Sequence, residues 1–279
     1  MAVVATRDIF VRANGLRHHL IARGSPGSPV VMMVHGLAGQ AHTFDAIAER
    51  LSASHHVYCL DVRGRGESEW GPADGYHMNN YVADLEAVRE ALGLRAFSLV
   101  GTSMGGIITM NYAPKYPEHV TKVVLNDIGP EIAPAGLARI IEYVGHAPKM
   151  FEDMKAVVKY YRENYAPMVE HLPEDQIATF AKWNVRKSDD GMYAWKMDPA
   201  IRSGGSTAVP ELEPWDAVKR IQCPALILRG ANSDVLSPET ATKMTQVMAD
   251  ARLVEVPGVG HAPVLVEPAA VEALEAFLG

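Results

Sequence analysis

The sequence predicts an α/β fold. A mostly parallel sheet is covered by helices, begins with an antiparallel hairpin and carries a helical insertion. Three observations support this prediction. Short apolar runs rich in β-forming residues alternate with helical patterns in residues 1–130 and again in 211–279. The first two runs flank Asn14 and Gly15, which is typical of a tight hairpin turn. Residues 131–210 are instead rich in helix formers and aromatic residues, with no convincing strand.

The alternation of apolar runs with helical patterns predicts where each strand and helix lies. Strands are expected at residues 8–12, 18–22, 30–34, 56–60, 97–100, 120–125, 225–228 and 252–256. Helices are expected at residues 43–51, 79–92, 107–112, 238–248 and 268–278. In the second helix, Tyr81, Leu85, Val88 and Leu92 recur every three to four residues, which is the spacing of one buried helix face. Because parallel strands need long crossovers, this alternation predicts a sheet with helices on both faces.

The domain organisation follows from where the alternation of strands and helices stops and where it resumes. Residues 1–130 and 211–279 are predicted to form one core domain, and residues 131–210 a helical cap inserted into it. A chain of 279 residues is long enough for this arrangement.

Composition narrows the class of partners. With 48% hydrophobic and 21% charged residues, the chain has the balance of a soluble globular protein. A net charge of -7 argues against nucleic acid or an anionic membrane as the main partner. Its two cysteines, Cys59 and Cys223, lie in apolar runs, which favours a reducing compartment, expected to be the cytoplasm, over a disulfide framework. We also expect no signal peptide at the start, and the apolar run at 30–34 is too short to span a membrane.

A candidate nucleophile lies in the middle of the core pattern. Gly101, Ser103 and Gly105 form a G-x-S-x-G motif between a predicted strand and a predicted helix. A reactive serine must project from a very tight turn, where a Cβ two residues before or after it would crowd the backbone. The following helix points its N-terminal N–H groups at the site and favours developing negative charge. The sequence therefore predicts that Ser103 is a nucleophile.

A tetrahedral intermediate also needs two convergent N–H donors. We assign one to Met104, directly after the nucleophile, and the other to Leu37, in the glycine-rich loop after the third strand. His35 in that loop is an alternative catalytic base, but its ring is expected to fix the loop by hydrogen bonding.

A serine nucleophile needs a histidine base and an orienting carboxylate. His261 is the predicted base, because it lies in a glycine-rich loop after the last strand. Asp234, which follows the strand at 225–228, is the predicted acid. Asp127 also follows a strand and is the alternative, although it could instead cap backbone groups where the insertion leaves the sheet.

Together these segments resemble the α/β-hydrolase superfamily over nearly the whole chain. The resemblance rests on His35-Gly36, residues 61–68 (Asp-Val-Arg-Gly-Arg-Gly-Glu-Ser), residues 101–106, Asp234 and Gly260-His261. It implies that Asp61 and Arg63 belong to a structural loop, that the insertion is the cap roofing the pocket, and that the protein is a serine hydrolase.

The resemblance also disfavours some activities. Members that open epoxides or remove halide have aspartate in place of Ser103. Members that cleave carbon–carbon bonds often have asparagine and an aromatic residue where Thr102 and Ala262 stand.

The sequence predicts cleavage of a carboxylic ester through an acyl-enzyme. A lactonase, a carbon–carbon hydrolase and a ligand-binding receptor on the same fold remain alternatives. Phe44, Tyr143, Trp183 and Trp195 are the candidate walls of an apolar substrate pocket. The expected partner is a small ester or lactone; no metal or cofactor is implied, and the oligomeric state is left open.

Overall fold

The computed structural model describes residues 6–203 and 212–279. Residues 1–5, on which the expectation about a signal peptide partly rests, lie outside the described residues, as does the predicted C-terminal end of the insertion.

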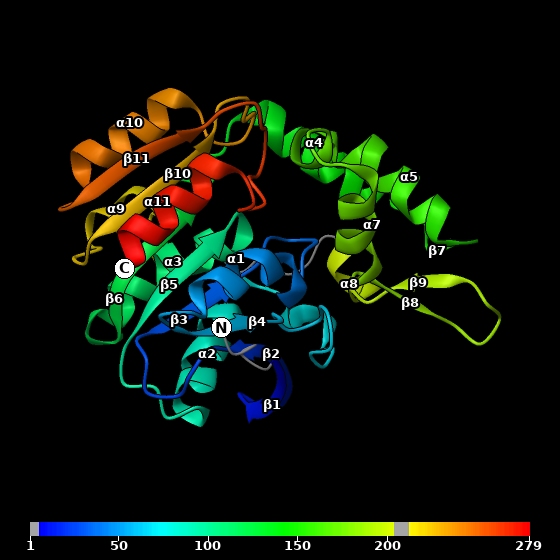
Figure 1. The fold of residues 1–279 in the computed structure, drawn as a ribbon, viewed down its shortest axis with the longest axis horizontal. Coiled ribbons are helices and arrows are strands. Elements are labelled where there is room, and N and C mark those ends of the chain that lie inside the picture. The colour runs from blue at the N-terminus through cyan, green and yellow to red at the C-terminus, as the bar shows by residue number, and fades with distance from the viewer. Residues whose placement is uncertain (1–5, 204–211) are drawn as a thin grey trace.

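An eight-stranded sheet forms the centre of the molecule (Figure 1), in the order β1-β2-β4-β3-β5-β6-β10-β11. Its strands are β1 (Arg7–Ala13), β2 (Leu16–Arg23), β3 (Val30–Val34), β4 (His56–Leu60), β5 (Phe97–Thr102), β6 (Val120–Asn126), β10 (Ala225–Gly230) and β11 (Ala251–Val256). From β4 to β11 all neighbours are parallel, whereas β2 is antiparallel to both β1 and β4. The predicted mostly parallel sheet with an N-terminal antiparallel hairpin is confirmed. The hairpin turn has positive φ at Asn14 (47°) and Gly15 (80°), as a type I′ turn requires.

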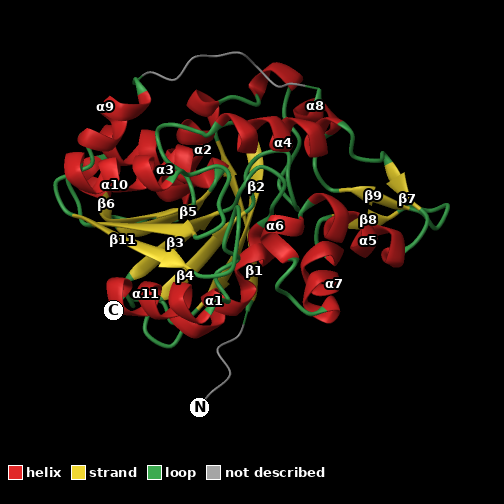
Figure 2. Ribbon diagram, turned by 90° about the horizontal axis from the view of Figure 1, so that it is seen from above, coloured by secondary structure: helices red, strands yellow, loops and turns green. Residues whose placement is uncertain are grey.

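Alternate strand residues face two separate cores. Met32 and Leu99 pack with the helices α2 (Met78–Ala91), α3 (Met104–Lys115), α9 (Pro214–Lys219) and α10 (Pro238–Val247). Met33 and Val100 pack on the opposite face with α1 (Asp45–Leu51) and α11 (Pro268–Leu278). Figure 2 shows these helices on the two sides of the sheet. Because both faces are covered, the central strands are apolar throughout rather than alternating.

Three short 3₁₀ helices lie in the connections: η1 (Ala41–Phe44), η2 (Ala73–Gly75) and η3 (Pro117–His119).

The segment between β6 and α9 is largely helical and lies beside the sheet (Figure 1). It contains α4 (Pro134–Gly145), α5 (Met154–Asn164), α6 (Ala166–Val169), α7 (Glu174–Lys182) and α8 (Pro199–Arg202). It has a core of its own around Val157, Tyr161 and Trp195. We call this segment the cap.

The expectation that this segment has no strand is wrong. A small antiparallel sheet joins β7 (Met150–Phe151), β9 (Tyr193–Trp195) and β8 (Val185–Lys187). Each strand has only two or three residues, too few for a period-two pattern to be recognised in the sequence.

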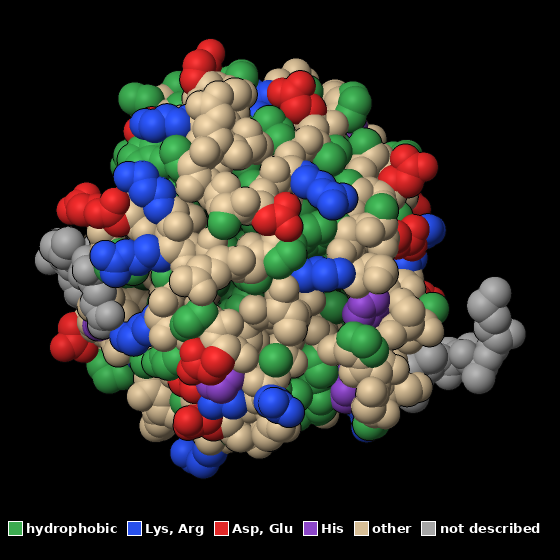
Figure 3. Space-filling model, turned by 90° about the vertical axis from the view of Figure 1, so that its left-hand side faces the viewer, with side chains coloured by type: hydrophobic (Ala, Val, Ile, Leu, Met, Phe, Trp, Pro, Cys, Tyr) green, Lys and Arg blue, Asp and Glu red, His purple; other side chains and the backbone are tan. Residues whose placement is uncertain are grey.

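On the face shown in Figure 3, acidic and basic side chains are interspersed with apolar ones. Within the described parts of the chain, no helix reaches the length and apolar character of a transmembrane segment.

Candidate active site

Ser103 lies at the tight turn between β5 and α3. Its backbone has φ 52° and ψ −116°, a conformation that side chains rarely adopt and that lifts the hydroxyl off the sheet. A Cβ on Gly101 would clash with the backbone of Gly105, and a Cβ on Gly105 would clash with the Val34 carbonyl of β3. Glycine is therefore required on both sides of the serine.

The His261 side chain meets Ser103 from the loop after β11. Ser103 Oγ and His261 Nε2 are 2.8 Å apart. The histidine is 7% exposed. Two residues 158 positions apart in the chain are thus joined by a hydrogen bond, as the sequence predicted for this pair.

The carboxylate behind His261 is Asp127, which corrects the prediction of Asp234. Asp127 Oδ2 accepts a hydrogen bond from His261 Nδ1 at 2.8 Å, and Asp127 is fully buried. It also accepts hydrogen bonds from the Ser233 hydroxyl, to Oδ2 at 2.7 Å, and from the Gly230 N–H, to Oδ1 at 2.9 Å. The aspartate is therefore fixed in position, with one oxygen aimed at the imidazole.

Asp234 is engaged by the cap instead. Its two oxygens accept a forked pair of hydrogen bonds from Arg139 of α4, from Nε at 2.6 Å and from Nη2 at 2.8 Å. The Arg139 guanidinium lowers the pKa of Asp234. The Asp234 side chain is 30% exposed. This aspartate joins the cap to the core rather than orienting His261.

The sheet order explains why the sequence offered both aspartates. Strand β5, which carries Ser103, lies between β3 and β6, and β10 follows β6. Asp127 and Asp234 thus both follow the carboxyl ends of neighbouring parallel strands, where sites on such sheets gather. Chain order, with the acid between serine and histidine, fits either one. The choice depends on the partner Arg139, which the sequence pattern did not reveal.

The two predicted oxyanion donors lie beside the serine. Leu37 is in the loop after β3 and lines the same pocket as Ser103. Its N–H donates to no other described group. Met104 is the first residue of α3, so its N–H has no acceptor within the helix. Both amides are free to bind an oxyanion.

His35 stabilises this loop through both ring nitrogens. Nδ1 lies 2.7 Å from the Gly36 carbonyl oxygen, and Nε2 accepts from the Val62 N–H at 3.1 Å. Burial lowers the pKa of His35 to about 4. The ring is neutral and has no free nitrogen for a catalytic role, which confirms the expectation that it fixes the loop.

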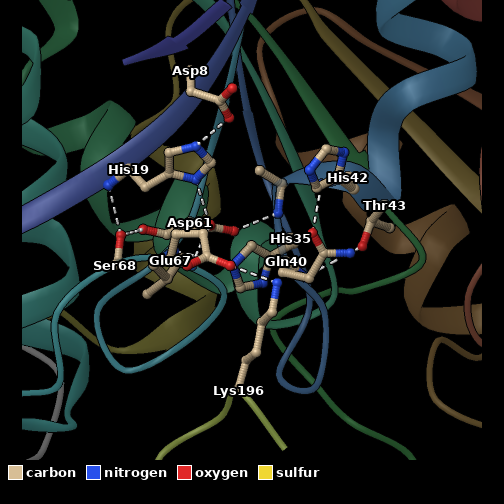
Figure 4. Close-up of polar contacts among 12 residues, drawn as sticks. Asp8, His19, His35, Gln40, His42, Thr43, Asp61, Glu67, Ser68 and Lys196 are labelled. Atoms are coloured by element: carbon tan, nitrogen blue, oxygen red, sulfur yellow. Dashed lines mark hydrogen bonds and ion pairs between the residues drawn. The ribbon is translucent and has the colours of Figure 1, made fainter. Parts of the chain in front are cut away.

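A buried cluster around Asp61 holds the same region (Figure 4). Asp61 accepts from the N–H groups of Ala41 at 2.6 Å and Glu67 at 2.8 Å, and from His19 Nδ1 at 2.7 Å. Burial opposes the charged imidazolium of His19, but the hydrogen bonds to Asp61 and Asp8 raise its pKa overall. Asp61 therefore ties the start of η1 to β2 and to the loop after β4, a structural role.

Core and cap together enclose a pocket of about 60 Å³ at Ser103. The core supplies Leu37, Ser103 and His261 among its walls. The cap supplies Arg139, Tyr143, Tyr165, Met168 and Phe180. The pocket is thus mostly apolar, and besides the reacting groups its polar side chains are Arg139, two threonines (Thr43 and Thr102) and the two tyrosines.

Of the four predicted pocket residues, only Tyr143 lines this pocket. Phe44 is 1% exposed and packs in the core beneath the sheet, because η1 turns its ring inward. Trp183 stacks on His42 with ring centres 3.7 Å apart. Trp195 belongs to the cap core and lines a neighbouring cavity. Tyr165, Met168, Phe180 and Arg139 were missed, because no periodicity distinguishes a cap residue facing the pocket from one facing the cap core.

Comparison with known proteins agrees with this architecture. The chain is 35% identical to the 3-hydroxybutyrate-oligomer hydrolase of Cupriavidus necator, over 88% of this chain and 87% of that protein. It is 29% identical to the 2-(acetamidomethylene)succinate hydrolase of Mesorhizobium japonicum, over 94% and 92%. The crystal structure of an alpha/beta hydrolase from Novosphingobium aromaticivorans superposes with a TM-score of 0.89 at 33% identity, covering 100% of this chain and 99% of that one. The family described as the alpha/beta hydrolase fold matches residues 29–268, and the chain therefore belongs to that family.

Proposed function

We propose that this hydrolase cleaves carboxylic esters through an acyl-enzyme on Ser103. The observation that carries the proposal is the continuous hydrogen-bonded path from Asp127 through His261 to Ser103. A serine hydroxyl becomes nucleophilic when an adjacent imidazole takes its proton and a buried carboxylate stabilises the resulting imidazolium. Each distance in this path, 2.8 Å, is that of a formed hydrogen bond.

The reaction follows from these contacts. His261 Nε2 takes the Ser103 proton while Oγ bonds to the ester carbonyl carbon, and the carbonyl oxygen becomes an oxyanion near the Leu37 and Met104 N–H groups. The intermediate collapses by breaking the carbon–oxygen bond to the alcohol, which leaves with the proton from His261. Water then adds to the acyl-enzyme with His261 again as base, releasing the acid and regenerating Ser103.

One relative supports an ester as the substrate. The relative that is 35% identical is named for hydrolysis of 3-hydroxybutyrate oligomers, whose units are joined by ester bonds. We therefore propose a small aliphatic hydroxy-acid ester as the substrate class. The pocket at Ser103, about 60 Å³, suits a short group on one side of the scissile bond.

The test is turnover of short-chain 4-nitrophenyl esters by wild type and Ser103→Ala. We expect Ser103→Ala to lower kcat on the order of 10⁶-fold, as loss of the nucleophile does in other triad enzymes. Ser98→Ala is the matched control, because Ser98 lies on the same strand and its hydroxyl forms a hydrogen bond with Thr121 rather than with His261. Wild-type activity in Ser103→Ala would exclude the mechanism.

A panel of lactones and diketones, assayed beside the esters, distinguishes an esterase from a lactonase, a carbon–carbon hydrolase and a ligand-binding receptor. Faster turnover of a lactone or of a diketone would reassign the activity to that bond type. A single slow turnover with retained product would favour a receptor over an enzyme.

A further inference from the structure

Two cavities outside the Ser103 pocket contact helix α4, and the first of them adjoins that pocket. One, of about 420 Å³, has Leu37, Met104 and Arg202 among its lining residues. The second, of about 600 Å³, shares Gly145 and Arg202 with the first. Leu37 also lines the Ser103 pocket, so the first cavity begins beside the proposed oxyanion donors. We call the first cavity the side chamber.

Helix α4 separates the side chamber from the Ser103 pocket. Arg139 and Tyr143 of this helix line the pocket, whereas Ile140 and Val144 line the side chamber. Most of the other walls of the side chamber are aliphatic or aromatic, such as Ile201. A substrate whose carbonyl lies at Leu37 and Met104 therefore has room for an extended chain in this direction.

The charges around these cavities are all of one sign. Arg65 and Arg202 line the side chamber, and Lys149 and Arg186 line the second cavity. No acidic residue is among the described residues that line either one. This is unexpected by chance in a chain of net charge -7. A one-sign lining of a concave site attracts ligands of the opposite charge.

Of the two arginines that line the side chamber, Arg202 makes fewer polar contacts with the described residues. Within residues 6–203 and 212–279 it forms no ion pair, and its polar contact is a long one of 3.4 Å from Nη1 to the Pro148 carbonyl. Its guanidinium carbon lies 4.4 Å from the centre of the Trp195 ring. Burial lowers the pKa of Arg202. By contrast, Arg139 on the other side of α4 is already paired with Asp234.

The carboxylate of Asp198, at the start of the helix α8 that carries Arg202, does not neutralise Arg202. Asp198 accepts from the Tyr76 hydroxyl at 2.5 Å and from the Ala200 N–H at 2.9 Å. The guanidinium of Arg202 therefore keeps N–H donors free for a ligand.

Arg65 is a buried cation, held in a fixed position, in the wall of the side chamber. It is 1% exposed, and it donates from Nε to the Leu37 carbonyl at 3.1 Å and from Nη1 to the Tyr81 hydroxyl at 3.0 Å. Nη2 contacts the sulfur of Met104 at 3.3 Å. This buried cation is held by neutral acceptors alone, so its positive potential is not cancelled by a carboxylate of the described chain.

We propose that the side chamber binds the carboxylate-bearing end of the substrate, with Arg202 as the group that pairs with that carboxylate. The proposal rests on the esterase function above and specifies the substrate class as an ester of an aliphatic chain that ends in a free carboxylate. A guanidinium binds a planar carboxylate through two parallel hydrogen bonds. The aliphatic walls cover the chain between the two ends.

The test compares matched substrates. Mono(4-nitrophenyl) esters of glutarate, adipate and suberate are measured against the same esters with the free carboxylate converted to a primary amide. We expect wild type to favour the carboxylate member of the best pair at least tenfold in kcat/KM. Arg202→Gln should lower that ratio at least tenfold, and Arg202→Lys should restore part of it. Arg252→Gln, an exposed cation of β11, is the control that should leave the ratio unchanged.

Calorimetric titration with adipate separates failure of this proposal from failure of the esterase function. If wild type cleaves none of these esters, adipate binding that is lost in Arg202→Gln still supports the side chamber. An unchanged carboxylate-to-amide ratio in Arg202→Gln, adipate binding that survives the substitution, or equal binding of inorganic phosphate would overturn the proposal.

Discussion

Replacing Asp127 by asparagine is the most direct test of the corrected triad. The substitution keeps the size of the side chain but removes the charge that faces His261 Nδ1 at 2.8 Å. If the amide NH₂ faces the ring, Nδ1 must become the acceptor and the ring proton moves to Nε2. In that tautomer Nε2 cannot take the proton of Ser103. Loss of the buried carboxylate also removes the partner of the imidazolium.

The size of the effect follows from the burial of this contact. Asp127 is fully buried and the His261 side chain is 5% exposed, so no solvent replaces the lost charge. The same substitution in a well-studied serine protease lowers kcat about 10⁴-fold, equivalent to about 5 kcal/mol of transition-state stabilisation. We expect a loss of this order for Asp127→Asn, measured as kcat on a short-chain 4-nitrophenyl ester.

Asp234→Asn is the matched control. Its side chain is 30% exposed and its partner is Arg139, and ion pairs of this exposure contribute at most about 1 kcal/mol. We expect its kcat to stay within about fivefold of wild type, with circular dichroism confirming that both variants are folded. A 10⁴-fold loss in Asp234→Asn together with near-normal kcat in Asp127→Asn would refute this assignment of the acid.

Three further predictions concern stability. Gly105→Ala should lower the free energy of unfolding, measured by urea titration, by about 3 kcal/mol or prevent folding, because its Cβ would clash with the Val34 carbonyl. Gly145→Ala is the control: no atom lies within 4 Å of its added Cβ, so it should be neutral or slightly stabilising in the same titration. Asp84→Ala should lower the free energy of unfolding by about 3–5 kcal/mol, because Arg63 is then a buried charge without its carboxylate partner among the described residues. The double replacement Arg63→Met and Asp84→Leu should lower this free energy less, and equal losses would contradict this reasoning. Folding lowers the pKa of His35 from 6.5 to about 4, so between these values the unfolded chain binds a proton that the folded chain does not. The contribution of the neutral His35 ring to the free energy of unfolding is therefore fully present above about pH 6.5 and falls by roughly 3 kcal/mol as the pH drops to about 4. The pH slope of unfolding free energy between pH 6.5 and 4 should therefore be shallower in His35→Gln, and parallel slopes would count against it.

The sequence was sufficient for the elements whose pattern is local. The strands of the sheet, the hairpin at Asn14-Gly15 and the strand–turn–helix around Ser103 each carry their signal within about ten residues. His261 was identifiable because few histidines follow Ser103 and one of these lies in a glycine-rich loop after a strand. These features depend on backbone geometry and hydrophobic periodicity, which one sequence displays.

The features that the sequence did not determine depend on contacts between distant segments. Asp127 and Asp234 occupy equivalent places after adjacent strands, and only the reach of Arg139 from α4 distinguishes them. Phe44 and Tyr143 are both aromatic residues near the site, yet one faces the core and the other the pocket. The side chains that line a pocket depend on the rotation of each helix, which residue type alone does not specify.

The placement of the reacting side chains on the core and of large pocket side chains on the cap has a consequence for how the substrate preference of this protein can evolve. Ser103, Asp127, His261 and Leu37 all lie on the central sheet or its loops, whereas the inserted helices supply the large side chains Arg139, Tyr143, Tyr165, Met168 and Phe180 of the pocket wall. The Ser103, His261 and Asp127 side chains are thus positioned by the core, while the cap contributes side chains that a substrate in this pocket would contact. Exchanging the helices that follow Asp127 for those of a relative should transfer preference for a new substrate while the chemistry is inherited intact.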